Sequence, residues 1–179
     1  MKNTNFINPE KVLFQAGLKT GQTVGDLGAG SGFYAIAAGK IVGPHGMVHV
    51  ADIKESALDH VMAEARVHNM NGIRTYLCDL SKAKLSGNFP EGECDMVIMT
   101  NIIHEIEDKK NLLVHAYRML KTGGRLVIVD WNSTPGPIGP AADKRVNENE
   151  VKKLVESSSL KYLKNLDTDP FHFGMVFEK

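Results

Sequence analysis

The sequence predicts an α/β protein with a doubly wound, mainly parallel sheet, and three observations lead to this prediction. Short apolar stretches with strand character alternate almost throughout with longer stretches of helical periodicity. The stretches at residues 95–100 and 125–129 are continuous apolar runs, as expected for parallel strands covered on both faces. Glycine and proline punctuate the boundaries between stretches. Alternation of this kind implies right-handed crossovers between parallel strands.

The first half of the chain is predicted to begin with a helix and to continue in strand–helix steps. Asn8 is a candidate N-cap, Pro9 occupies the first helical position and Gly17 follows the helix end. The elements that follow are, in order, a strand at 23–27, a glycine loop at 28–32, a helix at 33–42, a strand at 47–51, a helix at 55–68 and a strand at 73–77. In the helix at 55–68, apolar residues recur at helical spacing on one face.

The second half completes the sheet. Its predicted elements are a loop at 81–92, a strand at 95–100, a helix at 108–120, a strand at 125–129, a helix at 147–155 and strands at 160–166 and 171–177. Gly123-Gly124 is expected to end the helix that begins at Asp108, and Asn147 with Glu150 has the spacing of a capping box. The proline-bearing loop at 133–140 could cover a ligand.

Only a short turn joins the last two predicted strands, so they should form a hairpin with an antiparallel edge. The complete prediction is therefore a Rossmann-like, seven-stranded, mainly parallel sheet with an antiparallel C-terminal hairpin. We expect residues 1–179 to form a single domain, because this length is near the upper range of one ordinary domain.

Composition narrows the class of protein. Lys+Arg and Asp+Glu number 21 each, so net charge provides no general attraction to nucleic acid or anionic membranes. Cys78 and Cys94 have neither metal-ligand spacing nor the density of a disulfide scaffold, and we predict no metal site. The sequence shows no signal peptide and no stretch of membrane-spanning length. We therefore expect a cytoplasmic protein without membrane insertion.

The first strand runs into a glycine loop at the edge of the sheet where ligands of open α/β folds bind. Gly28, Gly30 and Gly32 are spaced more tightly than in the dinucleotide fingerprint G-x-G-x-x-G, because residue 33 is Phe. Asp26, two residues before the first glycine, would disfavour a pyrophosphate and favour a ligand with positive charge. A tight turn without a ligand is the structural alternative.

Two further acidic residues follow the next predicted strands. Asp52 ends the second strand, where a carboxylate can accept hydrogen bonds from ribose hydroxyls. Asp79 follows the third strand. Either residue alone could simply punctuate a strand end, but both together after such a loop indicate a nucleoside-binding site.

These features resemble motif I and its acidic partners in class I S-adenosylmethionine-dependent methyltransferases. Within that family, the segments at 101–104 and 120–125 are most similar to the small, ubiquinone-biosynthesis-like type 11 group. The resemblance implies S-adenosylmethionine as cofactor and S-adenosylhomocysteine as product, with Asp52 on the ribose and Asp79 on the adenine amino group. Its implied cofactor-binding set is Asp26, Gly28, Ala29, Gly30, Gly32, Asp52, Ile53, Asp79, Leu80 and Asn101, in which Ile53 and Leu80 are apolar walls for adenine.

Candidate acceptor-side residues follow the later strands. His104 has a side chain suited to proton transfer near neutrality, and we predict it as the catalytic base, although it could instead pack at the next helix and bond backbone. Trp131 and Asn132 follow the fifth strand and are predicted to bind substrate, although Trp131 could belong to the core. His172 could approach the same cleft, or it could be an edge-strand residue.

The predicted function is in-line methyl transfer from S-adenosylmethionine to a small-molecule acceptor that the sequence does not identify. The sequence lacks the Pro-Pro-aromatic and Pro-Cys signatures of nucleic-acid and glutamine methylating relatives, and Asn101 leaves the acidic set of metal-dependent catechol enzymes incomplete. A cofactor-binding subunit without turnover and a nicotinamide-dependent oxidoreductase remain as alternatives. Homodimerisation is compatible with such a domain, although no residue predicts it.

Overall fold

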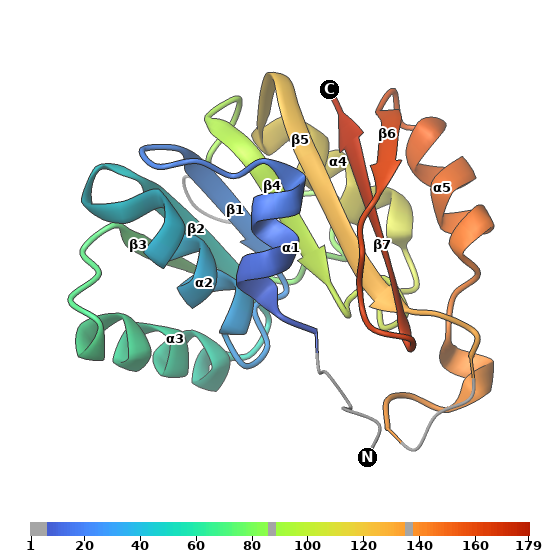
Figure 1. The fold of residues 1–179 in the computed structure, drawn as a ribbon, viewed down its shortest axis with the longest axis horizontal. Helices are drawn as coiled ribbons and strands as arrows, with labels where there is room; N and C mark the ends of the chain where they lie inside the picture. Colours follow the sequence, from blue (N-terminus) through green and yellow to red (C-terminus); the bar gives the residue numbers. More distant parts are fainter. Residues whose placement is uncertain (1–6, 86–88, 135–137) are drawn as a thin grey trace.

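The computed structural model describes residues 7–85, 89–134 and 138–179. In these residues helices flank one twisted sheet (Figure 1). The elements are α1 (Pro9–Ala16), β1 (Thr23–Leu27), α2 (Phe33–Val42), the 3₁₀ turn η1 (Gly43–His45), β2 (Met47–Asp52), α3 (Glu55–Val67), β3 (Ile73–Leu77), β4 (Cys94–Thr100), α4 (Lys109–Met119), β5 (Leu120–Trp131), the 3₁₀ turn η2 (Ala142–Lys144), α5 (Glu148–Glu156), β6 (Lys161–Asn165) and β7 (His172–Glu178).

The sheet has seven strands in the order β3-β2-β1-β4-β5-β7-β6. The strands β1 to β5 pair in parallel, and β7 is antiparallel to both of its neighbours. The strand order reverses between β1 and β4, which places the expected ligand edge at the carboxyl ends of these two strands. The predicted fold class and the antiparallel C-terminal hairpin are therefore confirmed, with β7 inserted between β5 and β6.

Two apolar layers cover the sheet because successive strand residues point to opposite faces. In β4, Met96 and Ile98 pack with α1, α2 and α3, whereas Val97 and Met99 pack with α4 and α5. All four of these side chains are buried. Because helices cover both faces of the sheet at β4, consecutive residues of this strand are all apolar, as predicted.

Helix caps follow the residues that the sequence marked. Asn8 accepts a hydrogen bond from the backbone N–H of Lys11 at 3.1 Å, and Gly17 ends α1 in the left-handed region with φ +88°. Asn147 caps α5 by accepting from the backbone N–H groups of Asn149 and Glu150.

The boundary between α4 and β5 differs from the prediction. The helix ends at Met119, and β5 begins at once with Leu120 instead of at Arg125. Gly123-Gly124 therefore lies inside an irregular strand, where the pairing with β4 shifts register. The N–H of Gly123 donates to the carbonyl of Lys179, and the N–H of Lys179 donates to the carbonyl of Gly124. Pairing with the end of β7 thus holds these glycines in the sheet.

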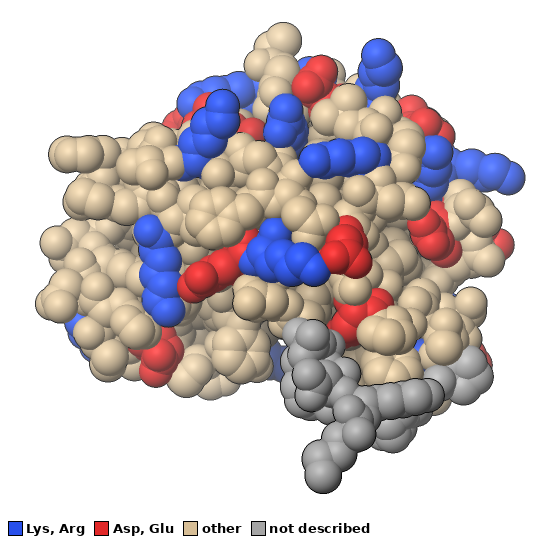
Figure 2. Space-filling model, in the orientation of Figure 1, with Lys and Arg blue, Asp and Glu red and all other residues tan. Residues whose placement is uncertain are grey.

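The surface carries both signs of charge. On the face shown in Figure 2, basic and acidic side chains are interspersed, in keeping with the equal totals of the sequence. The described helices include none with the length and apolar character needed to cross a membrane.

Candidate functional site

The glycine loop joins β1 to α2 at the switch point of the sheet. Gly28, Gly30 and Gly32 all have positive φ angles, of 84°, 51° and 76°. A Cβ at Gly28 would collide with Ile102, whereas a Cβ at Gly30 would meet no described atom within 4 Å. Gly28 is thus required for packing and for its backbone angle, while Gly30 leaves open space in front of the loop.

Asp52 fixes this loop from the end of β2. Its Oδ2 accepts from the N–H of Gly30 at 2.9 Å, and its Oδ1 accepts from the N–H of Lys54 at 2.8 Å. The N–H groups of Gly28 and Ala29 donate to the carbonyl of Ala51 in the same strand. Asp52 therefore has a structural role in addition to its predicted contact with ribose. Its two carboxylate oxygens keep lone pairs for further donors.

Asp26, near the end of β1, is the most unusual acid of the site. It is 1% exposed, and neither of its carboxylate oxygens has a hydrogen-bond partner among the described residues. Burial, with a smaller contribution from the charge of Asp52, raises its pKa to about 7. A buried carboxylate without a partner is costly to leave in place unless a ligand satisfies it.

The side of the loop expected to receive adenine has two exposed apolar residues. Ile53 is 61% exposed and Leu77 is 53% exposed, at the carboxyl ends of β2 and β3. Leu80, by contrast, is 4% exposed and packs in the core layer with α4, so little of its surface is free to touch a ligand. Asp79 accepts from the backbone N–H and the hydroxyl of Ser81, which lower its pKa.

Beyond β4, His104 forms a buried pair with Asp130 from β5. The His104 Nδ1–Asp130 Oδ1 distance is 2.7 Å, and the two side chains are 8% and 0% exposed. Burial lowers the pKa of His104, but the hydrogen bond and the charge of Asp130 outweigh it, so this pKa lies above its usual value. Asp130 also accepts from the N–H groups of Ile103 and Trp131, which fixes the chain around the histidine.

The remaining predicted acceptor-side residues lie at the same edge, because Trp131 of β5 pairs with His172 of the antiparallel β7. Their rings are 4.0 Å apart between centroids. His172 is not an edge-strand residue, since β7 lies between β5 and β6. The Asn132 side chain donates to the carbonyl of Pro170 and accepts from the N–H of Thr134, so it ties loop segments together.

Trp131 has other neighbours besides His172. A Cβ at Gly139 would collide with its ring, and the guanidinium carbon of Arg145 lies 5.4 Å from the ring centroid. Arg145 also donates to the carbonyls of Asn132, Thr134, Ile138 and Pro140. The described part of the loop predicted to cover the ligand is thus fastened over Trp131. Residues 135–137 of that loop lie outside the described residues.

Asn101, predicted on the cofactor side, follows β4 in the left-handed region with φ +52°. Its backbone N–H donates to the carbonyl of Val129, and its side chain is exposed. Asparagine tolerates this backbone region better than most residues, which gives Asn101 a structural role as well.

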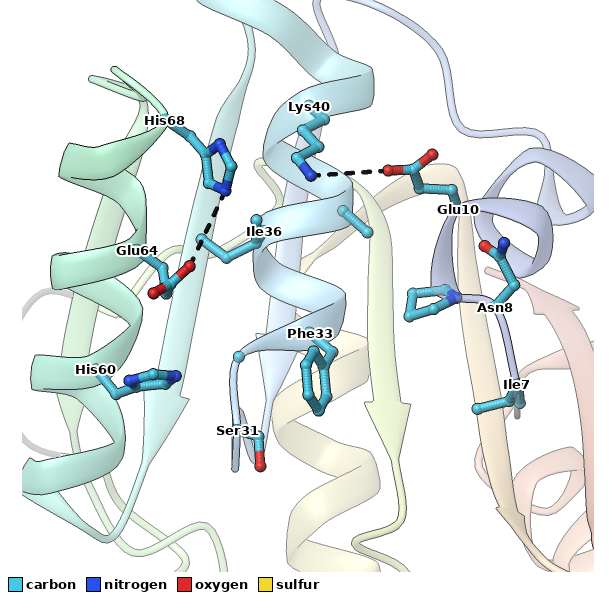
Figure 3. Close-up of a pocket in the computed structure, with 13 residues that line it drawn as sticks. Ile7, Asn8, Glu10, Ser31, Phe33, Ile36, Lys40, His60, Glu64 and His68 are labelled. Atoms are coloured by element: carbon cyan, nitrogen blue, oxygen red, sulfur yellow. Dashed lines mark ion pairs between the residues drawn. The ribbon is translucent and has the colours of Figure 1, made fainter. Parts of the chain in front are cut away.

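A separate hollow of about 690 Å³ lies between α1, α2 and α3 (Figure 3). The Lys40 Nζ–Glu10 Oε1 pair spans it from α2 to α1 at 4.0 Å, and the His68 Nε2–Glu64 Oε2 pair lies along α3 at 3.9 Å. Of the predicted site residues, only Gly32 lines it. The hollow is therefore distinct from the strand-end site, although it reaches the start of α2.

Comparison with known proteins identifies the family. The family described as a methyltransferase domain matches residues 18–174. The chain belongs to this methyltransferase family. A methyltransferase from Aquifex aeolicus, described as S-adenosylmethionine-dependent, superposes with a TM-score of 0.87 at 26% identity, covering 96% of this chain and 89% of that one. A type 11 methyltransferase from Sulfolobus solfataricus superposes with a TM-score of 0.74 at 25% identity, covering 98% and 94%.

The methyltransferase also resembles a curated protein, the ubiquinone/menaquinone biosynthesis C-methyltransferase UbiE of Psychromonas ingrahamii. The two are 32% identical over 120 residues, which cover 67% of this chain and 46% of the relative. The chain therefore spans about half the length of the relative it matches. Together, the comparisons confirm a class I, type 11 methyltransferase that uses S-adenosylmethionine, and they decide against the nicotinamide-dependent alternative.

The geometry of the methyltransferase fits this cofactor. Among the described residues Asp26 has a buried carboxyl without a partner, which suits an ammonium group. Gly30 faces open space, and Ile53 offers exposed apolar surface beside Asp52. These observations match the chemistry of an amino acid, a ribose and an aromatic base in sequence along one sheet edge.

Sequence reasoning did not single out Asp130 and Asp169, which hold the two predicted histidines, or Tyr34, whose buried hydroxyl has no partner among the described residues. Asp130 is the penultimate residue of the buried strand β5, close to the strand end as Asp52 is in β2, and this position was a signal that could have found it. Asp169 lies three residues before His172, in a turn where an acidic residue is unremarkable. Tyr34 lies on an apolar helix face, and no local signal marks its buried hydroxyl.

Proposed function

We propose that this methyltransferase methylates a small-molecule acceptor that loses a proton during transfer, with His104 as the proton acceptor and Asp130 as its positioning residue. The observation that carries the proposal is the buried His104 Nδ1–Asp130 Oδ1 hydrogen bond of 2.7 Å at the strand edge beside the glycine loop. Because Asp130 accepts at Nδ1, the neutral imidazole has its lone pair at Nε2, where it can receive a proton.

In this proposal, residues along the edge hold the cofactor from its amino-acid end to its base. Asp26 would pair with the ammonium group, and the backbone of Gly28, Ala29, Gly30 and Gly32 would allow its close approach. Asp52 would accept from ribose hydroxyls with the lone pairs that Gly30 and Lys54 leave free. Ile53 and Asp79 would contact the adenine. The buried position of Leu80 makes Leu77 the better apolar neighbour on that side.

The bound cofactor supplies a methyl group activated by a sulfonium. The protein aligns the acceptor, excludes water and removes a proton where the acceptor requires it. Asp130 raises the pKa of His104 and fixes its tautomer, so it makes the imidazole a stronger base at the atom that faces away from the carboxylate.

The neighbouring residues support a small acceptor. Trp131 and His172 enclose the edge on the side of β5 and β7, while Arg145 fastens the adjoining loop. The similar curated protein is named for a step in ubiquinone/menaquinone biosynthesis, which is small-molecule chemistry.

The test combines a direct titration with transfer of labelled methyl groups. Histidine resonances followed by NMR should show a pKa above the usual 6.5 for His104, and Asp130→Asn should lower it. Incubation with methyl-labelled S-adenosylmethionine and fractionated cell extract should place label in the small-molecule fraction. With the acceptor found there, His104→Asn should reduce turnover by about 100-fold or more. The exposed His45→Asn serves as the matched control.

The pH profile provides a second readout. Turnover should rise as pH increases through the pKa of His104, because only the neutral imidazole accepts a proton. Asp130→Asn should move this rise to lower pH. Label confined to protein or nucleic acid would contradict the small acceptor, and unchanged turnover in His104→Asn would contradict the base.

A further inference from the structure

Arg145, between η2 and α5, binds the backbone of the chain that follows β5. Its guanidinium donates to the carbonyls of Asn132, Thr134, Ile138 and Pro140. The Nη1–Asn132, Nη2–Ile138 and Nε–Pro140 distances are 3.3, 3.0 and 3.1 Å. A guanidinium can bind several carbonyls at once because its donors point in different directions within one plane. Arg145 thus connects residues that lie up to 13 positions away in the sequence.

Arg145 is better anchored than the backbone that it binds. The side chains of Thr134 and Ile138 are exposed, so burial of apolar surface contributes little to the placement of these residues. Val146, by contrast, packs against the core layer that contains α4 and α5, and Asn147 caps α5. The guanidinium therefore extends from a fixed part of the fold to a part that depends mainly on hydrogen bonds.

Trp131, at the end of β5, is held by the same arrangement. The guanidinium carbon of Arg145 lies 5.4 Å from the ring centroid, within the range of a cation–π contact. A Cβ at Gly139 would come within 2.6 Å of a ring carbon, so this backbone also lies against the ring. His172 stacks on Trp131 with 4.0 Å between centroids. The tryptophan is nevertheless only half-buried, which leaves part of its surface open to a bound molecule.

The backbone of Trp131 is linked to the proposed base. Its N–H donates to Oδ1 of Asp130 at 2.7 Å, and His104 Nδ1 lies 2.7 Å from the same oxygen. Trp131 and His104 therefore share one carboxylate oxygen. Contacts that fix Trp131 thus act on a residue that is directly joined to the histidine–carboxylate pair of the proposed function.

We propose that Arg145 is a positioning residue for the acceptor, an inference that rests on the proposed function. Arg145 holds the ring of Trp131 in place, and the open surface of that ring forms an apolar wall for the acceptor beside His104. Arg145 acts through Trp131 and through the backbone that it binds, without touching the acceptor. Lysine cannot replace it, because an ammonium group lacks the planar set of donors that reaches several carbonyls.

Fluorescence tests whether Arg145 holds Trp131, because Trp131 is the only tryptophan of the chain. The protein is saturated with S-adenosylhomocysteine and excited at wavelengths that tyrosine does not absorb. Arg145→Ala should shift the emission to longer wavelength and raise the rate of quenching by acrylamide at least about twofold, because the ring becomes more exposed. Arg145→Lys, which keeps the charge, should show most of the same change.

Transfer kinetics test the link to the acceptor. Methyl-labelled S-adenosylmethionine is kept saturating, while the small-molecule fraction of cell extract is varied by dilution. Both Arg145 variants should need about five- to tenfold more of this fraction for the half-maximal rate, with affinity for S-adenosylhomocysteine unchanged within about twofold. Arg66→Ala, on the exposed face of α3, is the matched control and should change neither value nor the fluorescence.

The possible failures are distinguishable. Unchanged Trp131 fluorescence in both variants would overturn the positioning role. Altered fluorescence with no change in the amount of extract fraction required would overturn it as well, because Arg145 would then only stabilise the chain after β5. Loss of S-adenosylhomocysteine affinity in both variants would assign Arg145 to the cofactor side instead. Absence of labelled small molecules with the unaltered protein would refute the proposed function, and the fluorescence would still show whether Arg145 holds Trp131.

Discussion

Replacing Asp26 by Asn should stabilise the protein without cofactor while removing most of its affinity for S-adenosylmethionine. The pKa of this carboxyl is raised from 3.8 to about 7, first by burial and then by the charge of Asp52. A pKa raised in the folded state means that stability present below pH 4 is lost as pH rises through about 7. At 1.36 kcal/mol per pKa unit, the full loss is about 4 kcal/mol above pH 8.

The asparagine variant never ionises and escapes this loss. Its melting temperature should exceed that of the unaltered protein at pH 8, by about 2–4 °C for each kcal/mol recovered. At pH 4, where Asp26 is protonated in the folded protein, the two melting temperatures should converge.

Cofactor binding should reverse the protonation of Asp26. At pH 6 about nine tenths of the Asp26 carboxyls are protonated, given a pKa of about 7. The α-amino group of the ligand, with a pKa of about 7.7–8.0, is already charged at this pH. Pairing of carboxylate with ammonium should therefore release about 0.9 proton per bound cofactor at pH 6. Affinity should fall by about fourfold from pH 8 to pH 6, because the roughly tenfold loss of carboxylate is partly offset by the ligand amino group, which is only about 40% charged at pH 8.

Calorimetry in buffers of different ionisation enthalpy measures this proton release directly. S-adenosylhomocysteine, which keeps the ammonium group but lacks the sulfonium charge, should release the same number of protons. Asp26→Asn should show weak binding and no buffer dependence. A buffer-independent enthalpy in the unaltered protein at pH 6 would refute the reasoning, because Asp26 would then either be ionised beforehand or lie away from the cofactor.

Two further predictions concern the loop. Asp52→Ala should leave the protein folded and weaken cofactor binding by at least about 100-fold, because the ribose contacts and the hydrogen bond to Gly30 are both lost. Asp52→Asn keeps one acceptor oxygen and should lose less affinity. Retained affinity in Asp52→Ala, measured by calorimetry, would contradict the assignment. Gly28→Ala should destabilise the protein more than Gly30→Ala, since only Gly28→Ala adds a collision with Ile102 to the left-handed backbone cost of about 1–2 kcal/mol. Gly30→Ala should mainly weaken cofactor binding. Equal melting temperatures for the two variants would contradict these different roles of the two glycines.

The fold could be predicted from sequence because its determinants are local. Continuous apolar runs marked the buried parallel strands, and caps at Asn8 and Asn147 marked helix starts that the structure bears out. The start of β5 could not be predicted in this way. Gly123 belongs to the sheet only because Lys179 pairs with it, and such a contact between distant segments leaves no local pattern.

The candidate site shows the same contrast between features that follow from local sequence and contacts between distant segments. Asp52 and His104 could be predicted to lie at the ligand edge because each is at or just beyond the carboxyl end of a parallel strand. The partner of His104 is Asp130, which lies 26 residues away, and such a contact between distant segments leaves no local pattern in the sequence. Leu80 is the reverse case, because its position after β3 predicted a ligand contact while its side chain is 4% exposed and packs in the core layer.

The four acidic residues of the candidate site differ in how many hydrogen-bond donors already stabilise their carboxylates. Asp130 and Asp169 each hold a histidine, and Asp52 holds backbone N–H groups, so their carboxylates are already stabilised by donors. Asp26 alone among these four has none within the described residues. A cation therefore gains most by approaching Asp26, because there it replaces a missing interaction instead of competing with an existing one. We therefore expect the amino-acid end of the cofactor to lie toward β1, which leaves the two histidines for the acceptor.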